Sequence, residues 1–173
     1  MKYADNLPRL APAVAELAPL ITHEGGEYIL WCRARFPWSR DAVFRFFSDA
    51  RNLEQITPPW LQFKVLTEDP IQMQVGALID YRLKIRGVPL KWRTVITQWQ
   101  PPKKFEDSQL CGPYRQWIHE HAFIDEGGTT LMQDKIRYKV LGGAPVHWLL
   151  VKRDLLRIFR YRSHVLGKMF PKS

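Results

Sequence analysis

Two histidines and an aspartate lie close together in the segment Gly112–Tyr138 and could carry out proton transfer. His119 and His121 are two positions apart, so on a strand their side chains would share one face. Asp134 follows on what reads as the next strand, within reach of either histidine. A histidine that a carboxylate orients can act as a general acid or base near neutral pH. These three residues are therefore the candidate catalytic group.

The same three residues allow other interpretations. Two histidines and one carboxylate can bind a transition metal. A third interpretation is a buried polar network, in which Asp134 satisfies a histidine and fixes the hairpin. The sequence favours this network, or the lining of a ligand pocket, over catalysis. No metal site is expected, because one hairpin without further residues at ligand spacing is weak evidence for one.

The segment that carries these residues reads as a β-hairpin with its turn at Asp125–Gly128, where glycine supplies positive φ. Alternation predicts one inward face on each strand, because the other face of the second strand is mostly charged. The length of the turn leaves two registers open. A loop of Gly127 and Gly128 alone places His121 opposite Asp134, whereas a different loop length places His119 there. The inward residues are Arg115, Trp117, His119, His121, Phe123, Met132, Asp134, Ile136 and Tyr138.

A second hairpin is predicted from Leu78–Arg86 and Val88–Trp99, with the turn about Gly87. A turn at Gly87 and Val88 would set Tyr81 opposite Thr94 and Leu83 opposite Trp92. Apolar and charged residues alternate along both strands, so this hairpin also has one wet face and one buried face. The inward face of the hairpin includes Tyr81, Trp92, Thr94 and Gln98.

The remaining elements follow from periodicity and from helix start and stop signals. Residues 1–26 are rich in Ala, Pro and Leu, and we expect an N-terminal arm with short helical turns at most. Ser39 is placed to cap a first short helix, and Pro58 ends a second one over Asn52–Ile56. The longest helical pattern runs from Val146 to about Phe170, with apolar residues at spacings of three and four. Further strands are predicted at Glu27–Phe36, Leu61–Thr67 and Lys104–Leu110.

The composition limits the class of protein. The chain has 173 residues, of which 46% are hydrophobic and 25% charged, and this is ordinary for a globular domain. The net charge is +9, but the basic residues are dispersed and no nucleic-acid motif accompanies them, so no nucleic-acid partner is expected. Two cysteines, Cys32 and Cys111, indicate a reducing, cytoplasmic setting. No segment reaches the roughly 20 apolar residues of a membrane span.

This order of elements and several short motifs resemble the SRPBCC or START-like superfamily, and within it the ligand-binding group that includes polyketide cyclase/dehydrase-like and coenzyme-Q-binding START proteins. The resemblance covers about residues 28–170. The motifs are N-L-x-x-I-T-P-P-W-L at Asn52–Leu61, Gly76 with Tyr81, P-L-K-W-R-T at Pro89–Thr94, P-P-K-K-F-E-D at Pro101–Asp107, G-P-Y-R-Q-W-x-H-x-H-x-F at Gly112–Phe123, and G-T-x-x-x-D-x-x-x-Y from Gly128 to Tyr138 with a second Thr.

The resemblance implies an α+β helix-grip fold. A curved antiparallel sheet of about seven strands would wrap around the long C-terminal helix, with two short helices between strands one and two. Residues 27–173 would form one START-like ligand-binding domain. Its function would be to bind or carry a hydrophobic small molecule or lipid in a cavity between sheet and helix. The alternative is a polyketide cyclase/dehydrase-type enzyme that uses His119 or His121 as general acid or base.

The residues expected to line this cavity come from the inward faces and from one loop. No cofactor is expected, and the basic surface could make a weak contact with a membrane. The sequence predicts neither the ligand nor the oligomeric state. The predicted ligand-binding residues are Trp60, Tyr81, Trp92, Thr94, Trp117, His119, His121, Phe123, Asp134 and Tyr138.

Overall fold

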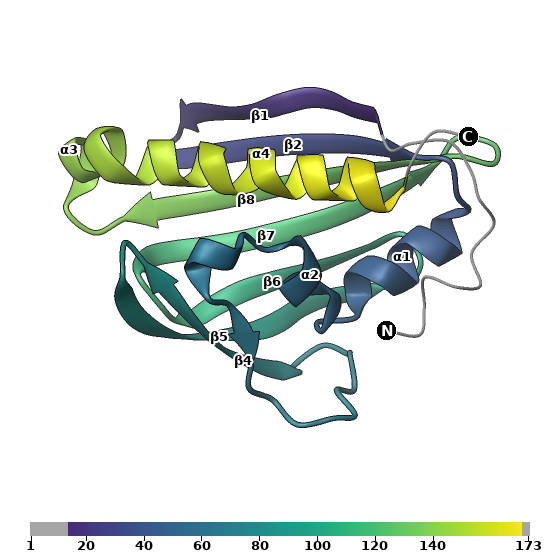
Figure 1. Cartoon of the computed structure of the whole chain (residues 1–173), viewed down its shortest axis with the longest axis horizontal. Coiled ribbons are helices and arrows are strands. Elements are labelled where there is room, and N and C mark those ends of the chain that lie inside the picture. Colours follow the sequence, from purple (N-terminus) through teal and green to yellow (C-terminus); the bar gives the residue numbers. More distant parts are fainter. Residues whose placement is uncertain (1–13, 171–173) are drawn as a thin grey trace.

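The computed structural model describes residues 14–170, with the backbone alone for residues 14–17. Figure 1 shows a curved sheet whose concave face holds one long helix. The strands are β1 Val14–Glu24, β2 Glu27–Phe36, β3 Lys64–Val65, β4 Leu78–Ile85, β5 Val88–Gln100, β6 Lys104–Cys111, β7 Tyr114–Asp125 and β8 Thr130–Val140. The helices are α1 Arg40–Ser48, α2 Asn52–Ile56, the 3₁₀ turn Pro59–Leu61, α3 Gly143–Val146, the π-helical turn His147–Val151, and α4 Lys152–Met169.

The eight strands form one antiparallel sheet in the order β1-β2-β8-β7-β6-β5-β4-β3. The helix that begins with α3 continues through α4 and lies across the concave face, while α1 packs against β7 and α2 against α4 (Figure 1). This arrangement is the helix-grip fold, and the α+β prediction is confirmed. The sheet has one strand more than the expected seven.

The additional strand is β1, which lies in the region where short helical turns were expected. It pairs with β2 from Val14↔Arg35 to Glu24↔Glu27, with one register shift on each side of Leu17. Pro19 is tolerated because β1 is an edge strand, where one face of the backbone needs no partner. Pro8, Pro12 and Pro19 were the reason for expecting short helical turns at most in residues 1–26. That expectation was wrong for residues 14–24, which form β1. Residues 1–13 of the predicted arm lie outside the described part.

The β4–β5 hairpin has a different register from the predicted one. Its turn is Arg86 and Gly87, both with positive φ (51° and 82°), as a two-residue type I′ turn requires. Tyr81 therefore pairs with Trp92 and not with Thr94. Because the error is two residues, the inward and outward faces are preserved.

A register shift in β5 between Ile96 and Gln98 reverses the alternation near its end. Gln98 was expected to face inward, but its amide donates to the carboxylate of Glu106 at 3.4 Å. Trp99 faces inward instead, with its ring centroid 5.3 Å from that of Phe44. A β-bulge inserts one extra residue and so turns the following side chains over.

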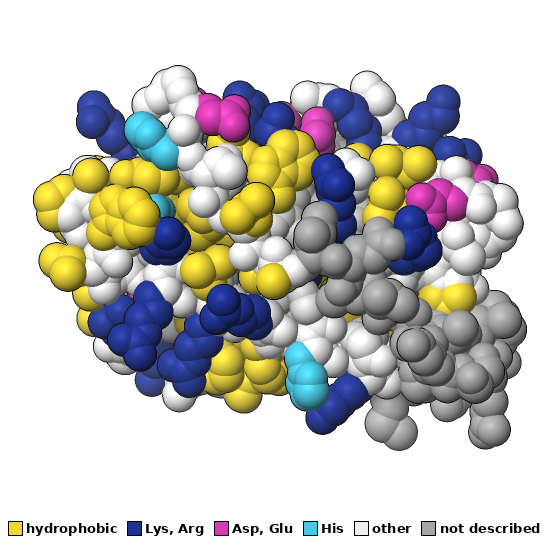
Figure 2. All heavy atoms as spheres, turned by 90° about the horizontal axis from the view of Figure 1, so that it is seen from above, with side chains coloured by type: hydrophobic (Ala, Val, Ile, Leu, Met, Phe, Trp, Pro, Cys, Tyr) yellow, Lys and Arg dark blue, Asp and Glu magenta, His cyan; other side chains and the backbone are white. Residues whose placement is uncertain are grey.

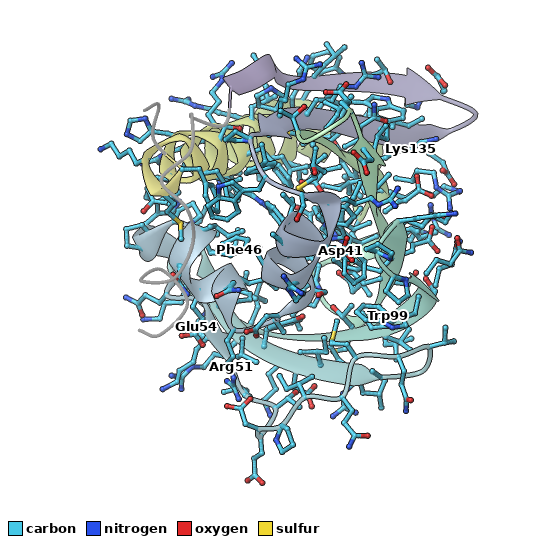
Figure 3. All side chains as sticks on the ribbon, turned by 90° about the vertical axis from the view of Figure 1, so that its right-hand side faces the viewer. Asp41, Phe46, Arg51, Glu54, Trp99 and Lys135 are labelled. Carbon is cyan, nitrogen blue, oxygen red and sulfur yellow. The ribbon has the colours of Figure 1, made fainter. Side chains whose placement is uncertain are left out.

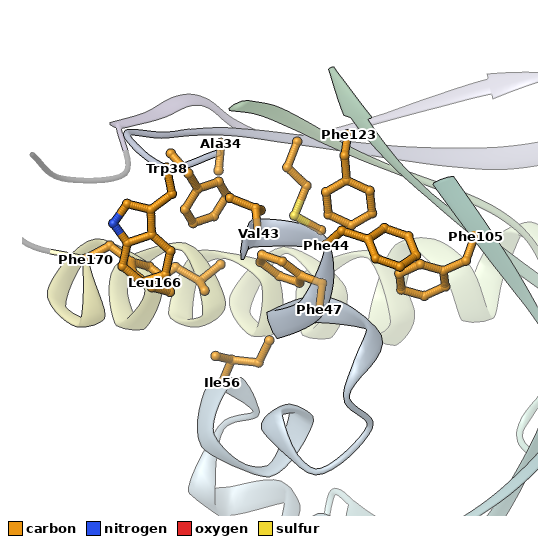
Figure 4. Close-up of a cluster of buried hydrophobic side chains, with 12 residues drawn as sticks. Ala34, Trp38, Val43, Phe44, Phe47, Ile56, Phe105, Phe123, Leu166 and Phe170 are labelled. Carbon is orange, nitrogen blue, oxygen red and sulfur yellow. The ribbon is translucent and has the colours of Figure 1, made fainter. Parts of the chain in front are cut away.

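An aromatic cluster closes one end of the sheet–helix interface. Phe44 and Phe47 of α1 pack edge-on or tilted against Phe123, at centroid distances of 5.3 and 6.0 Å (Figure 4). Phe170 follows α4 and packs against Trp38 at 4.2 Å. Burial of these rings supplies much of the hydrophobic stabilisation, at roughly 25 cal/mol per Å² of apolar surface. Packed side chains therefore fill this end of the sheet–helix interface.

The opposite face of the sheet is turned to solvent. Lys135 lies on this face, on the side of the sheet away from α4 (Figure 3). Arg51 and Glu54, at the start of α2 and within it, lie near the lower end of the view and connect α2 to the segment around β3. Arg51 donates to the carbonyls of Val65 and Thr67, and Glu54 accepts from the Val65 amide at 2.8 Å. In residues 14–170, no helix is both long and apolar enough to cross a membrane.

Candidate functional site

A cavity of about 190 Å³ lies between the concave face of the sheet and α4. Its wall is mostly apolar and aromatic, which is typical of sites for apolar small molecules. Strands β4 to β7 supply one side, α4 another, and α1, α2 and the segment around β3 the third. The lining side chains are Phe47, Ala50, Leu53, Thr57, Leu61, Phe63, Met73, Ile79, Tyr81, Leu83, Ile85, Trp92, Thr94, Ile96, Phe105, Asp107, Tyr114, Trp117, His119, His121, Leu155, Ile158, Phe159 and Arg162.

Polar groups converge at one part of this wall. His121 Nδ1 lies 2.7 Å from Asp134 Oδ1, and His119 Nε2 lies 3.3 Å from the same oxygen. The other ring nitrogen of His121, Nε2, lies 3.4 Å from Asp107 Oδ2. Both histidines are buried, and their ring centroids are 3.8 Å apart. The two imidazoles thus lie between two carboxylates.

The register of the β7–β8 hairpin decides how these residues meet. Glu126 donates its amide to the Thr129 carbonyl at 2.9 Å, so the loop is Gly127 and Gly128 alone. His121 is therefore directly opposite Asp134, and His119 is opposite Ile136. Of the two registers that the sequence left open, the first is correct. Both histidines nevertheless reach the carboxylate.

The surroundings assign different charges to the two histidines. Burial lowers the pKa of His119, and the nearby His121 lowers it further, so His119 is neutral at pH 7. Burial also opposes charging of His121, but Asp134 and Asp107 outweigh it and raise its pKa. Burial would raise the pKa of Asp134, yet Arg162 and both histidines hold it well below its usual range. Asp134 is therefore ionised, and its negative charge faces His119, His121 and Arg162.

Arg162 and Asp107 belong to the cluster, although the sequence analysis did not select them. Arg162 is 9% exposed, and its Nη2 lies 3.7 Å from Asp134 Oδ2. Its Nε and Nη2 have no hydrogen-bond partner among the described residues. Arg162 occupies the apolar stripe of α4, three residues after Phe159, and that spacing was a signal that it faces the sheet. Asp107 is two residues after the apolar Phe105 on β6 and so shares its face, which gave the same signal.

Six of the ten predicted ligand-binding residues line the cavity. Besides the two histidines they are Tyr81, Trp92, Thr94 and Trp117. The indole of Trp92 donates to the Thr94 hydroxyl at 3.1 Å, so the indole N–H has a partner inside the protein. Burial raises the pKa of Tyr81 above its usual range, and its phenol stays protonated. Contact of these side chains with a ligand remains a prediction.

The other four predicted residues lie beside the cavity and do not line it. Asp134 lies behind the histidines, and Phe123 belongs to the aromatic cluster. Tyr138 is fully buried, and its hydroxyl is 3.0 Å from His147 Nε2. Trp60 is 41% exposed and packs edge-on against Tyr161, with the Arg157 guanidinium 4.2 Å from the centre of its ring.

A second hollow adjoins the cavity between the β4–β5 turn and α4. Its volume is about 230 Å³, and Trp60 lies in its wall. Leu61, Ile85, Tyr114 and Ile158 line both spaces, so these side chains lie between the two. Arg86 spans the hollow with a bidentate contact to Asp154, at 2.8 and 3.2 Å. This ion pair connects the turn to the helix.

Solved structures with the same arrangement share little sequence with this chain. A protein from Arthrobacter aurescens is 13% identical with a TM-score of 0.68, and covers 89% of this chain and 92% of its own. Protein Ms6760 of Mycobacterium smegmatis is 15% identical with a TM-score of 0.63, covering 91% and 97%. A START superfamily protein from Mycobacterium smegmatis is 14% identical with a TM-score of 0.59, covering 83% and 99%. At such identities the likeness shows the fold alone.

The family follows from the sequence itself. Comparison with curated proteins gives no match. A family model described as polyketide cyclase / dehydrase and lipid transport matches residues 37–158, which include α1, the sheet from β3 to β8 and the first part of α4. Its match covers most of the cavity wall described above. The chain therefore belongs to the polyketide cyclase/dehydrase and lipid transport family.

Proposed function

We propose that this protein binds or carries a hydrophobic small molecule or lipid in the cavity between the sheet and α4. The observation that carries the proposal is the wall of the cavity, which is aromatic and aliphatic except for one polar part. An apolar ligand body would displace water from the apolar wall, and this gains free energy in proportion to the area covered. Family membership supports the same class of ligand.

The polar part of the wall suggests which end of a ligand would lie there. Besides the Thr94 hydroxyl, which accepts from Trp92 and can still donate its own proton, the polar groups in this part of the wall are His119, His121, Asp107 and Arg162. Arg162 has donors without partners, and buried donors gain most from a new acceptor. We therefore infer an amphipathic ligand, with an oxygen-bearing end at the histidines and an apolar body toward β4 and α4.

Displacement of an apolar fluorescent probe tests this function. The probe 8-anilinonaphthalene-1-sulfonate should bind the purified protein with a blue-shifted emission, and long-chain fatty acids should compete with it. Leu83 lines the cavity, so Leu83→Trp should reduce binding at least tenfold by filling it. Lys84 is the next residue on β4 and points to the other face, so Lys84→Trp is the matched control. Equal binding by both variants would contradict the proposal.

The family also supports a second function, a cyclase or dehydrase reaction in the same cavity. The specific observation in its favour is that His119 lines the cavity as a neutral base beside Asp134. A neutral imidazole can accept a proton from a bound substrate. His119→Gln should then abolish turnover of a polyketide-type substrate while probe binding remains. If turnover persists, His119 is not the base.

A basic and apolar surface near the start of the C-terminal helix supports a weak contact with an anionic membrane. Trp148, Leu149 and Leu141 are 62%, 75% and 60% exposed, and Lys152 lies over the Trp148 ring at 4.0 Å. Figure 2 shows hydrophobic and basic side chains together at this end of the molecule. Aromatic and basic residues in one patch suit the membrane interface.

We infer a cytoplasmic location, because Cys32 and Cys111 are free thiols.

A further inference from the structure

The strand pairing brings three metal-ligating side chains to one point in the cavity wall. Asp107 of β6 is directly opposite His119 of β7, and His121 is two residues further on the same face. Directly opposite residues have Cβ atoms about 5 Å apart on one side of the sheet. One ligating atom from each of Asp107, His119 and His121 lies within 4.8 Å of the others. The backbone register itself therefore sets the convergence.

The separation of the ligating atoms suits a small divalent ion. His121 Nε2 and Asp107 Oδ2 are 3.4 Å apart. A tetrahedral ion about 2.0–2.1 Å from each ligand holds neighbouring ligand atoms about 3.3–3.4 Å apart. This pair can therefore bind an ion with little movement of either side chain.

A second carboxylate stands where it would orient the histidine ligands. Asp134 Oδ1 contacts His121 Nδ1 at 2.7 Å, which leaves Nε2 of that ring directed toward Asp107. It also contacts His119 Nε2 at 3.3 Å. In metalloproteins, a ligating histidine commonly gives its other nitrogen to such a carboxylate, which fixes the tautomer and strengthens the ligand. Asp134 is thus placed as a positioning residue.

The charges of the cluster also favour a cation. Asp107 and Asp134 bring two negative charges to a largely buried site, and Arg162 brings one positive charge at 3.7 Å from Asp134. With both imidazoles neutral, the form in which histidine binds a metal, the carboxylates and the guanidinium together are net negative. A divalent ion would compensate the buried carboxylates, whose charge is otherwise costly in an apolar wall.

We propose that Asp107, His119 and His121 bind a first-row divalent transition-metal ion of the zinc or iron(II) class, with an open coordination position facing the ligand cavity. Imidazole ligands favour such ions over magnesium and calcium. Three protein ligands leave a position for an oxygen atom of a bound molecule. The carboxylate differs from the one that the sequence suggested, because Asp134 lies behind the histidines and does not line the cavity. The proposal does not depend on apolar ligand binding.

Cobalt(II) serves as the probe, because its visible d–d absorption reports coordination. Protein treated with a chelator and then dialysed should bind one equivalent of Co²⁺ with a d–d band, and Zn²⁺ should displace it. Asp107→Asn and His121→Gln should each weaken Co²⁺ binding at least tenfold. Asp134→Asn should weaken it about 10- to 100-fold through the ligands that it orients. The matched control is His164→Gln, since His164 is an exposed histidine of α4.

A measurement on the unmutated protein guards against variants that fail to fold. The proton NMR spectrum of the Co²⁺ protein in H₂O should show two paramagnetically shifted imidazole N–H signals that vanish in D₂O, one from each histidine ligand. The absence of any d–d band, or of shifted N–H signals, would overturn the metal site. A band that is unchanged in Asp107→Asn and His121→Gln would overturn it as well. Probe binding without Co²⁺ binding would leave the proposed function standing.

Discussion

His121 and Asp134 face each other directly across β7 and β8, and His121 Nδ1 lies 2.7 Å from Asp134 Oδ1. The carboxylate also contacts His119 and Arg162, so one anion holds side chains from β7 and α4 together. The sheet and the helix are thus joined by a buried electrostatic contact at the polar end of the cavity.

Removal of the Asp134 charge should destabilise the fold strongly. Asp134→Asn leaves Arg162 and His121 buried without their anion, and removing one partner of a buried pair costs about 3–5 kcal/mol. Urea unfolding followed by tryptophan fluorescence measures this loss. Asp80→Asn is the control, because Asp80 pairs with Arg93 at 2.7 Å in an exposed contact worth about 0–1 kcal/mol. Similar losses in both variants would argue against a structural role for the buried cluster.

The ion pair between Arg86 and Asp154 should slow ligand exchange. Both residues lie in the wall of the hollow between the β4–β5 turn and α4, which shares four lining side chains with the cavity. Arg86→Ala should therefore raise the dissociation rate of the bound probe several-fold in stopped-flow fluorescence. Because the contact is exposed, stability should change by less than about 1 kcal/mol. The control is Arg93→Ala, which breaks the Asp80 pair on the same hairpin, and equal rates in both variants would rule out a gate.

The exposed apolar patch should mediate membrane contact. Trp148→Ser combined with Leu149→Ser should lower cosedimentation with vesicles of phosphatidylserine and phosphatidylcholine, because burial of apolar side chains drives interfacial binding. Binding of the unmutated protein should fall as salt rises, since its basic residues are then screened. Ile124 is 43% exposed near the end of β7 that is opposite to the Tyr114–Val140 pair, so Ile124→Ser is the control. No binding by the unmutated protein would contradict the membrane proposal.

The buried His147 should make stability depend on pH. Burial lowers its pKa in the folded state, whereas the unfolded side chain titrates near about 6.5. The unfolded state therefore binds the proton more strongly, and the free energy of unfolding should fall as pH drops through 6.5. His147→Gln keeps a hydrogen-bonding side chain near Tyr138 but does not titrate. The difference in urea midpoint between pH 7.5 and 5.5 should be smaller in this variant, and an equal difference would exclude His147 as the cause.

The sequence predicted the fold and most inward faces because a register error of two residues leaves each side chain on its own face. The β4–β5 hairpin is two residues out of the predicted register, yet Tyr81 and Trp92 still face the cavity. Prediction from the sequence failed where a local irregularity decides which way a side chain points or whether a strand forms. The bulge after Ile96 replaces Gln98 with Trp99 on the inner face, and proline-containing β1 is stable only because it lies at the edge.

The sequence predicted only those residues of the polar cluster in the candidate site that lie on one hairpin. His119, His121 and Asp134 are close in the chain, so one hairpin brings them together. Asp107 and Arg162 come from β6 and α4, and their proximity depends on the pairing of a third strand and on the docking of the helix. Periodicity placed both on buried faces, but only the assembled fold shows that they meet.

The cavity wall formed by the segment around β3 is not part of a long strand pairing, unlike the walls formed by β4 to β7. Strand β3 has two residues, and Arg51 secures the chain beyond it by donating to the Val65 and Thr67 carbonyls. Met73 reaches the cavity from that same stretch. Side-chain contacts and isolated backbone bonds, from Leu66 to Asp80 and from Gly76 to Ile96, hold this stretch in place of a continuous ladder. We therefore expect insertions or deletions there to alter the width of the cavity without disturbing the sheet. Changes in this loop can thus alter ligand preference without touching the polar cluster on β6, β7 and β8.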